Sequence, residues 1–417
     1  MMRTALLMFV VGIGWIGCYK DNPAFDPDAG MSCSSSADCA GDPGRLACDV
    51  SDSKTCVQCT AAEPAACTGR TPVCGAGKSC RACEAHDECS SKLCLPDGSC
   101  AAGDKVAYVA PVPVGSANDM CSMDMPCTEV AKALQRGLPY IKIQDTIDEL
   151  VSIRDQNVAL FGDGPQARLK PTKPGIVVKI EGASEVEIYD LAITGGLGVG
   201  GIGVATPVGS SVKLSLVRSR IASNAGGGIV TSNSNVTLSR CLVLENTLGG
   251  LALSGGSFDV TNTYIARNGG AASSFGGVQL TNMTVGTHRF EFNTVTANSA
   301  MVGTSGVVCA LVNQPIGLSN NIVYGNLGAG AGTQVSGANC TWTYSDIGPD
   351  PLQVSGEGIL NVDPAFSTSG AQAYSLSDGS MVKDMADPNA TLMIDFDGDA
   401  RPQGARRDMG ADEVKGP

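Results

Sequence analysis

LVRSRIASN, residues 216–224, is the first of five nine-residue segments built on one pattern. The other four are LSRCLVLEN (238–246), VTNTYIARN (260–268), FEFNTVTAN (290–298) and LSNNIVYGN (318–326). Each segment ends in asparagine, with a branched aliphatic residue three positions earlier and a large apolar residue eight positions earlier. A small or polar residue lies between them, five positions before the asparagine. The intervals between the asparagines are 22, 22, 30 and 28 residues, so the pattern keeps its register through insertions.

Such a repeat predicts a solenoid in which each repeat forms one coil of short strands. Successive coils would stack about 4.8 Å apart, so that the aliphatic residues form continuous inward columns. The terminal asparagines would then form a hydrogen-bonded ladder along the turns: Asn224, Asn246, Asn268, Asn298 and Asn326. We predict an all-β protein whose main body, residues 140–360, is a right-handed parallel β-helix. A β-propeller and a leucine-rich repeat are the alternatives, but blades of about 40 residues and a leucine-rich consensus are missing.

The N-terminal residues have the features of an export signal. An apolar run at residues 5–16 follows Arg3; it is too short to cross a bilayer and has the size of a signal-peptide core. Gly17-Cys18 follows and resembles the lipobox of bacterial lipoproteins. The resemblance implies that residues 1–17 are removed and that Cys18 carries a lipid, which would hold the protein at the outer membrane or cell surface. An ordinary cleaved signal peptide is the alternative.

Twelve of the 18 cysteines lie between Cys33 and Cys100, in three groups of four with few large apolar residues. Such a stretch cannot bury a core, so disulfides must replace one, as they do in oxidising compartments. Zinc is the competing interpretation of the two C-x2-C spacings. The spacing leaves the pairing of the cysteines open. It resembles the cysteine-rich repeats of myxobacterial surface lipoproteins, and residues 18–32 read as a polar linker before them.

Two segments flank the predicted coils. Residues 107–139 contain a strand, a short helical pattern at 128–134 and two cysteines, Cys121 and Cys127, that we expect to be bridged locally. This segment resembles the N-terminal cap of pectin-lyase-like proteins, which covers the open edge of the first coil. Of the cysteines within the coils, Cys241 should be a buried free thiol, whereas Cys309 and Cys340 are either bridged or merely packed.

The C-terminal segment, residues 361–417, carries a second resemblance. It contains DPAF (363–366), YSL (374–376), DFDGDARP (395–402) and DMGADE (408–413). These motifs are similar to the choice-of-anchor Q ending of bacterial β-helix surface proteins. The resemblance implies an exported β-helix that this segment caps, and it implies no activity.

Carboxylates are scarce on the coils. Between residues 192 and 345 there are only Asp259, Glu245 and Glu291, and they fall at different offsets in the repeat. Hydrolases that resemble this chain in fold use paired carboxylates, and the lyases hold Ca²⁺ with several. We therefore expect a non-catalytic surface protein for adhesion or polysaccharide binding. The alternative is a divergent carbohydrate-active enzyme (lyase, hydrolase or epimerase) with its site in the inserts 271–278 or 300–307.

Two outward arginines are the candidate ligand-binding residues. Arg218 and Arg240 share one offset, with Asn262 next in the column, and guanidinium groups match the carboxylates of an acidic polysaccharide. A solvated face is the alternative. The net charge of −13 argues against nucleic acid as a partner.

A calcium loop is a further hypothesis. Asp395, Asp397 and Asp399 alternate around Gly398 in a manner reminiscent of a Ca²⁺ loop. In the alternative, these carboxylates brace Arg401 or Arg406. We predict no other cofactor.

Overall fold

The computed structural model describes residues 31–41, 44–111, 120–283, 286–310, 315–328, 333–350, 354–367 and 373–415. The chain divides into two compact units, Met1–Cys100 and Ala101–Pro417. The predicted signal peptide, Cys18 and nearly all of the linker lie outside the described residues. No helix within the described residues is long and apolar enough to cross a membrane.

The first unit consists of three small modules, each closed by two disulfides. In every module the first cysteine is bonded to the third and the second to the fourth: Cys33–Cys48 and Cys39–Cys56, Cys59–Cys74 and Cys67–Cys80, Cys83–Cys94 and Cys89–Cys100. Regular structure is limited to β1 (Ala47–Cys48), β2 (Cys56–Val57), β3 (Val73–Cys74), β4 (Cys80–Arg81), and the 3-10 turns η1 (Ser36–Cys39), η2 (Pro64–Ala66) and η3 (His86–Glu88). The thiols form disulfides and are not zinc ligands.

The second unit begins with η4 (Gly103–Lys105), β5 (Val106–Val109), α1 (Val130–Gln135) and β6 (Tyr140–Ile147). β5 pairs in parallel with β6, and α1 buries Val130, Ala133 and Leu134. The Glu149 carboxylate accepts hydrogen bonds from the backbone N–H groups of Val130 and Ala131 at the start of the helix. The predicted Cys121–Cys127 bridge is confirmed.

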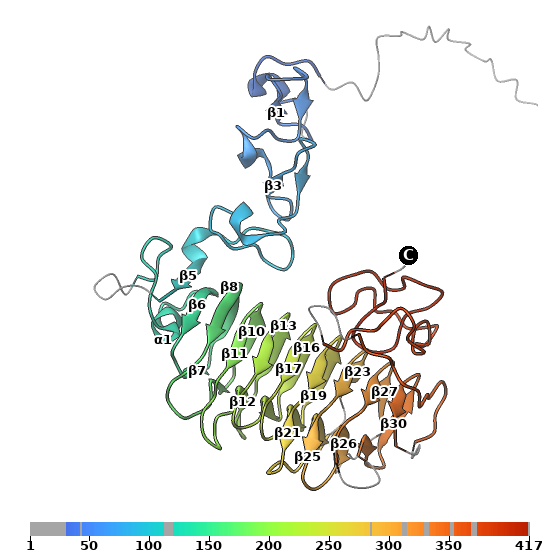
Figure 1. The fold of residues 1–417 in the computed structure, drawn as a ribbon. Coiled ribbons are helices and arrows are strands. Elements are labelled where there is room, and N and C mark those ends of the chain that lie inside the picture. Colours follow the sequence, from blue (N-terminus) through green and yellow to red (C-terminus); the bar gives the residue numbers. More distant parts are fainter. Residues whose placement is uncertain are drawn as a thin grey trace, which may run out of the picture. The chain divides into compact units, whose positions relative to one another are not determined.

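Three stacks of parallel strands form the coils (Figure 1). The first stack contains β8 (Asn157–Leu169), β10 (Glu185–Tyr189), β13 (Lys213–Val217), β16 (Asn235–Ser239), β19 (Ser257–Thr261), β23 (His288–Glu291), β27 (Ile316–Ser319) and β30 (Cys340–Thr343). The second contains β11 (Ala192–Thr194), β14 (Arg220–Ala222), β17 (Leu242–Leu244), β20 (Tyr264–Ala266), β24 (Thr294–Thr296), β28 (Ile322–Tyr324) and β31 (Asp346–Gly348). The third contains β7 (Val151–Arg154), β9 (Val178–Glu181), β12 (Val204–Thr206), β15 (Ile229–Ser232), β18 (Leu251–Ser254), β22 (Val278–Thr281), β26 (Val307–Ala310) and β29 (Val335–Ser336). A small pair, β21 (Gly269–Gly270) and β25 (Ser299–Ala300), lies between the second and third stacks.

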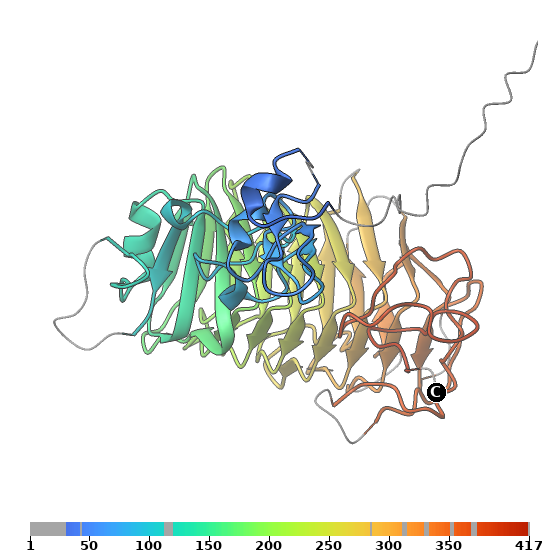
Figure 2. The same cartoon turned by 90° about the horizontal axis from the view of Figure 1, so that it is seen from above.

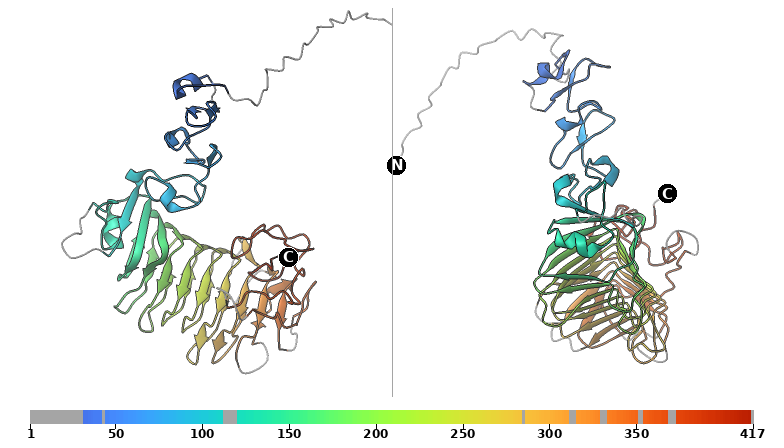
Figure 3. Two further views of the ribbon diagram at one scale, coloured as in Figure 1. Left: turned by 45° about the horizontal axis from the view of Figure 1, so that its top comes forward. Right: turned by 90° about the vertical axis from the view of Figure 1, so that its left-hand side faces the viewer.

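The strand register explains the sequence pattern. The aliphatic position of the motif forms one buried column in the second stack: Ile193, Ile221, Val243, Ile265, Val295, Val323 and Ile347. The large apolar position forms another in the first stack: Ile188, Leu216, Leu238, Val260 and Phe290. The chain is therefore an all-β protein with a right-handed parallel β-helix, as the sequence predicts, preceded by small disulfide-rich modules. Figures 2 and 3 show the row of coils from above and from its N-terminal end.

The five asparagines are fully or almost fully buried at the turn after the second stack. The side-chain N–H₂ of each donates to the side-chain oxygen of the next, from Asn224–Asn246 at 2.9 Å to Asn298–Asn326 at 2.8 Å. A second, shorter ladder joins Asn293 to Asn321 at the other corner of the coil. The same side chains also accept hydrogen bonds from backbone N–H groups and donate to backbone carbonyls, so the ladder satisfies buried backbone groups of the coils.

The three cysteines of the coils differ in whether they form a disulfide. Cys241 lies in the column of the second ladder as a buried free thiol, and burial raises its pKa to about 12, so it is chemically inert. Cys309 and Cys340 form a disulfide, which settles the alternative that the sequence left open.

Candidate functional site

A sharp corner separates the first stack from the second. One residue per coil adopts the left-handed backbone conformation there, with φ between 44° and 59°. We call this set the corner column: Asp190, Arg218, Arg240, Asn262, Phe292, Asn320 and Tyr344. The corner column therefore contains the two arginines and the asparagine singled out from the sequence.

The C-terminal segment lies along this corner, beside the coils (Figures 1 and 3). Arg240 Nε donates to the Phe396 carbonyl at 2.7 Å, and Asn262 Nδ2 donates to the Ile394 carbonyl at 2.8 Å. Further along, the Gly410 N–H donates to the Asn320 carbonyl at 2.8 Å. The segment thus covers the corner column on successive coils. The end of the last coil is instead packed by Val354 and Ile359.

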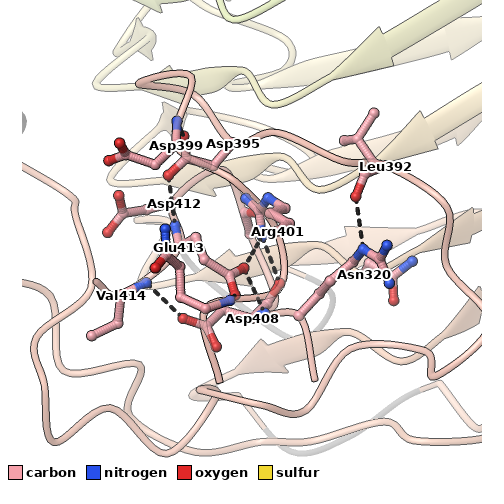
Figure 4. Close-up of polar contacts among 12 residues, drawn as sticks. Asn320, Leu392, Asp395, Asp399, Arg401, Asp408, Asp412, Glu413 and Val414 are labelled. Atoms are coloured by element: carbon pink, nitrogen blue, oxygen red, sulfur yellow. Dashed lines mark hydrogen bonds and ion pairs between the residues drawn. The ribbon is translucent and has the colours of Figure 1, made fainter. Parts of the chain in front are cut away.

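A buried arginine holds the segment together (Figure 4). The fully buried Arg401 guanidinium donates to the Asp408 carbonyl at 3.0 Å and to the Glu413 carboxylate at 3.0 Å. It also donates to the Gly410 carbonyl at 2.8 Å, and it lies 4.7 Å from the centre of the Phe292 ring. Because Phe292 belongs to the corner column, this cation–π contact ties the segment to the coils.

The three aspartates proposed as calcium ligands have separate roles. The Asp395 carboxylate accepts hydrogen bonds from the backbone N–H groups of Gly398, Asp399 and Glu413 at 2.8–3.1 Å, so it closes a turn. Asp399 pairs with Lys415 at 3.1 Å. Among the described residues, the only groups of three potential metal ligands that converge are cysteines of the disulfide modules. The structure does not gather Asp395, Asp397 and Asp399 around one point as calcium ligands. The carboxylate that pairs with Arg401 is Glu413.

A pocket of about 200 Å³ opens where the edge of the C-terminal segment meets the coils. Its lining comes from two adjacent coils and from the segment: Arg218, Ser219, Arg220, Arg240, Leu242, Phe396 and Asp397. Apolar surface from Leu242 and Phe396 thus adjoins three guanidinium groups.

The arginines of this pocket differ in how they are paired. Arg218 binds the Asp190 carboxylate through Nε and Nη2, both at 2.7 Å, and this pairing raises its pKa. Burial, followed by the neighbouring charge of Arg218, lowers the pKa of Arg240. Among the described residues, no carboxylate lies within ion-pair distance of Arg220 or Arg240. Asp397 is the acidic residue of the lining, and its pKa is raised by burial and by Asp395 and Asp399. The pocket therefore has a surplus of positive charge.

The sequence anticipated part of this site. Arg218 and Arg240 lie in one column, as the register predicts, and line one pocket. Asn262 is only 1% exposed, because the C-terminal segment covers it. The hypothesis that Asn262 contacts a ligand is therefore wrong. Sequence reasoning missed Phe396, and it named Asp397 only as a calcium ligand. Both belong to the DFDGDARP motif, but nothing in a linear pattern places that motif beside Arg240.

A second polar cluster lies on the outer face of the first stack. The register pairs Asp259 with Arg289 and Thr261 with Glu291, so the two carboxylates are diagonal neighbours on adjacent strands. Arg289 lies between them, 3.7 Å from Asp259 and 3.0 Å from Glu291. Asp259 and Glu291 therefore differ in offset, as the sequence shows, and are nevertheless close through the diagonal. Glu245 lies elsewhere, paired with Arg267 at 2.7 Å.

Comparisons with known proteins add little beyond the fold. A family of unknown function (DUF8331) matches residues 17–106, which include the disulfide modules. No curated protein matches the chain. The crystal structure of pectate lyase Pel9A is similar, with 14% identity and a TM-score of 0.43, over 74% of this chain and 96% of that one. The Dettilon tailspike protein (gp208) is similar with 14% identity and a TM-score of 0.27, over 66% and 65% of the two chains.

Proposed function

We propose that this chain is a non-catalytic surface protein that binds acidic polysaccharide at the Arg240 pocket. Disulfides join all the cysteines of the modules and two pairs in the second unit, which is typical of an extracytoplasmic protein. The finer assignment, a lipid anchor at Cys18 in the outer membrane or at the cell surface, is part of the proposal.

The observation that carries this proposal is the partly buried guanidinium of Arg240. Its Nε is bonded to a carbonyl, no carboxylate pairs with it, and Arg218 repels it. A buried charge without a counter-charge is costly, and an incoming carboxylate would offset that cost. Phe396 and Leu242 supply the apolar surface on which a sugar ring can pack.

The size of the pocket favours a polymer over a free small molecule. Pockets that enclose drug-sized ligands measure about 300–1,000 Å³, whereas this one measures about 200 Å³ and is open. It would hold one uronic acid residue while the rest of the chain extends over the coils. Affinity would then come from several weak contacts.

Binding of oligogalacturonate or alginate oligomers, measured by calorimetry, tests the proposal. The protein for this test is the full chain with Cys18→Ala, so that no lipid is attached. Arg240→Ala should weaken binding roughly 10–100-fold, because a hydrogen bond to a charged group contributes about 1.5–3 kcal/mol. Arg154→Ala removes an exposed positive charge from the third stack and should leave the affinity unchanged. Binding should also weaken as salt rises.

The alternative is a divergent carbohydrate-active enzyme that uses Asp259 and Glu291. The diagonal placement of these carboxylates favours it, and the fact that Arg289 occupies both of them counts against it. Release of unsaturated or shortened oligomers, with or without Ca²⁺, would overturn the non-catalytic proposal. Affinity that is equal in wild type and Arg240→Ala would exclude this pocket as the binding site.

The anchor is tested separately. Cys18→Ala should move the protein from the membrane fraction to the soluble fraction. A protein that stays in the membrane fraction after this substitution is not anchored through Cys18.

A further inference from the structure

Charge is distributed unevenly around the coils. From β12 onward, the strands of the third stack contain no charged residue, although 17% of the residues in the whole chain are charged. The loops that precede these strands are also free of charge: residues 195–203, 225–228, 247–250, 269–277, 299–306 and 327–334. The charged residues of the same coils belong to the first and second stacks and their corners. We call the outer side of β12, β15, β18, β22, β26 and β29 the neutral face.

The neutral face is lined by uncharged side chains of small to medium size. The register aligns one outward column along the stack: Ala205, Val230, Ala252, Gln279, Val308 and Ser336. Next to it runs a second column: Ser232, Ser254, Thr281 and Ala310. Apart from Ala205, these side chains are partly exposed. Figure 1 shows the C-terminal segment beside the opposite part of the last coils, away from β25 and β26.

Exposed aliphatic side chains border this face. In the loops before the third stack, five large apolar side chains are exposed: Leu197 (42%), Val199 (83%), Met301 (66%), Val302 (69%) and Leu327 (61%). Val208 (82%) lies in the loop that follows β12. The side chains before β12 and those before β26 and β29 therefore expose apolar surface at both ends of the neutral face.

We propose that the neutral face is the surface through which two copies of this chain associate. Each copy carries a net charge of −13, so two copies repel each other wherever charged faces meet. A two-fold contact places each patch opposite the same patch of the partner, so a charged side chain near the axis meets its own copy. An uncharged patch has no such repulsion and removes no charge from water on association. Two sheets pack face to face about 10 Å apart, so the third stack of one copy can lie against the third stack of another.

The size of the neutral face suits such a contact. Six strands about 4.8 Å apart extend about 29 Å along the coil. A stable interface needs about 800 Å² per partner, which at this length requires a width of about 28 Å. Strands of two to four residues supply at most about 13 Å of it, and the described uncharged loops beside them, such as residues 195–203 and 269–277, supply the remainder. The pocket at Arg240 lies at the opposite corner between the first and second stacks, so association leaves it open.

The molar mass of the full chain with Cys18→Ala, measured by light scattering and sedimentation over a wide concentration range, tests this inference. Gln279→Glu is nearly isosteric and places a negative charge on the neutral face. It should weaken association at least tenfold, because the contact would bury a charge against an uncharged surface that offers no counter-charge. Ala252→Glu should act in the same direction. Thr237→Glu makes a comparable change on the outer face of β16 in the first stack and should leave the mass unchanged.

Three outcomes would overturn the inference. The first is a monomeric wild type at every concentration. The second is association that neither Gln279→Glu nor Ala252→Glu weakens, or that Thr237→Glu weakens equally. The third is a monomer that binds vesicles of neutral phosphatidylcholine through this face, which would make a lipid surface the partner. Binding of oligogalacturonate or alginate oligomers at Arg240 is measured independently of self-association. A chain that does not associate through the neutral face would therefore leave the proposed glycan site unaffected.

Discussion

The two units of this chain are stabilised in different ways. In the first module of the disulfide-rich unit, the buried cluster consists of the four cysteines themselves: Cys33, Cys39, Cys48 and Cys56. In the second unit, continuous columns of aliphatic side chains fill the coils, and asparagine ladders satisfy the turns. The first unit therefore depends on a few strong covalent links, whereas the second sums many small contributions repeated from coil to coil.

Reduction should unfold the disulfide-rich unit and leave the coils folded. This is the largest effect that we predict. Each bridge contributes about 2–4 kcal/mol, and the modules have no apolar core to replace it. Dithiothreitol should therefore unfold residues 31–100 and open sites such as Lys54 and Arg70 to trypsin. The coils should keep their β-type circular dichroism, because only Cys121–Cys127 and Cys309–Cys340 link that unit. Simultaneous loss of both units would show that the coils also depend on the cross-links.

The units should also respond to pH in opposite directions. In the first unit, hydrogen bonds from Lys78 and Arg81 lower the pKa values of Asp49 and Glu88, respectively. These pairs stabilise the fold above the unfolded-state pKa, and the stabilisation is lost as pH falls. In the second unit, burial raises the pKa of Asp346 to about 7. Its Oδ2 is buried and has no hydrogen-bond partner. The protonated form therefore stabilises the last coil below about pH 4, and this contribution is lost as pH rises to about 7.

Asp346→Asn tests the predicted direction of this pH dependence. The Asn side chain keeps an oxygen to accept the hydrogen bond from the Val362 N–H, which Asp346 accepts at 3.0 Å. Between about pH 4 and 7, the unfolding free energy of wild type should fall relative to the variant by up to about 1.4 kcal/mol per pH unit. Asp378→Asn, at an exposed position, should change neither slope nor midpoint. The unfolding free energies of wild type and Asp346→Asn are measured by denaturant titration at each pH. If they change with pH in parallel, the side chain of Asp346 is not a buried, protonated carboxyl.

Whether a feature of the fold or of the site could be predicted from the sequence depends on how far apart its residues lie along the chain. The nine-residue pattern sets the aliphatic columns and the Asn224–Asn326 ladder, because each coil binds the next one at a fixed offset. The pocket needs a bond from Arg240 to Phe396, 156 residues away, and no periodicity carries that information. The sequence did not reveal that Asp259 and Glu291 lie close together for a related reason, since diagonal neighbours on a sheet differ in offset.

The disulfides could be predicted only in part. The groups of four are visible in the spacing, but four cysteines allow three pairings, and only the backbone geometry selects one. The choice at Asp395 between a calcium loop and a brace for Arg401 or Arg406 was open for the same reason. A carboxylate serves several roles, and in the structure that of Asp395 accepts hydrogen bonds from the backbone N–H groups of Gly398, Asp399 and Glu413.

The ladder offers the finest test of the summed stability of the coils. Asn246 donates to the Ile221 carbonyl at 3.1 Å and to Asn268 at 2.9 Å, and its oxygen accepts from Asn224 at 2.9 Å. Asn246→Leu leaves these buried partners unpaired and should lower the unfolding free energy by about 1–3 kcal/mol. Asn235→Leu removes an exposed asparagine from β16 and should cost no more than about 0.5 kcal/mol. Chemical denaturation of both variants provides the comparison. If the two asparagines prove equal, the ladder contributes nothing beyond an ordinary surface residue, and the aliphatic columns alone stabilise the coils.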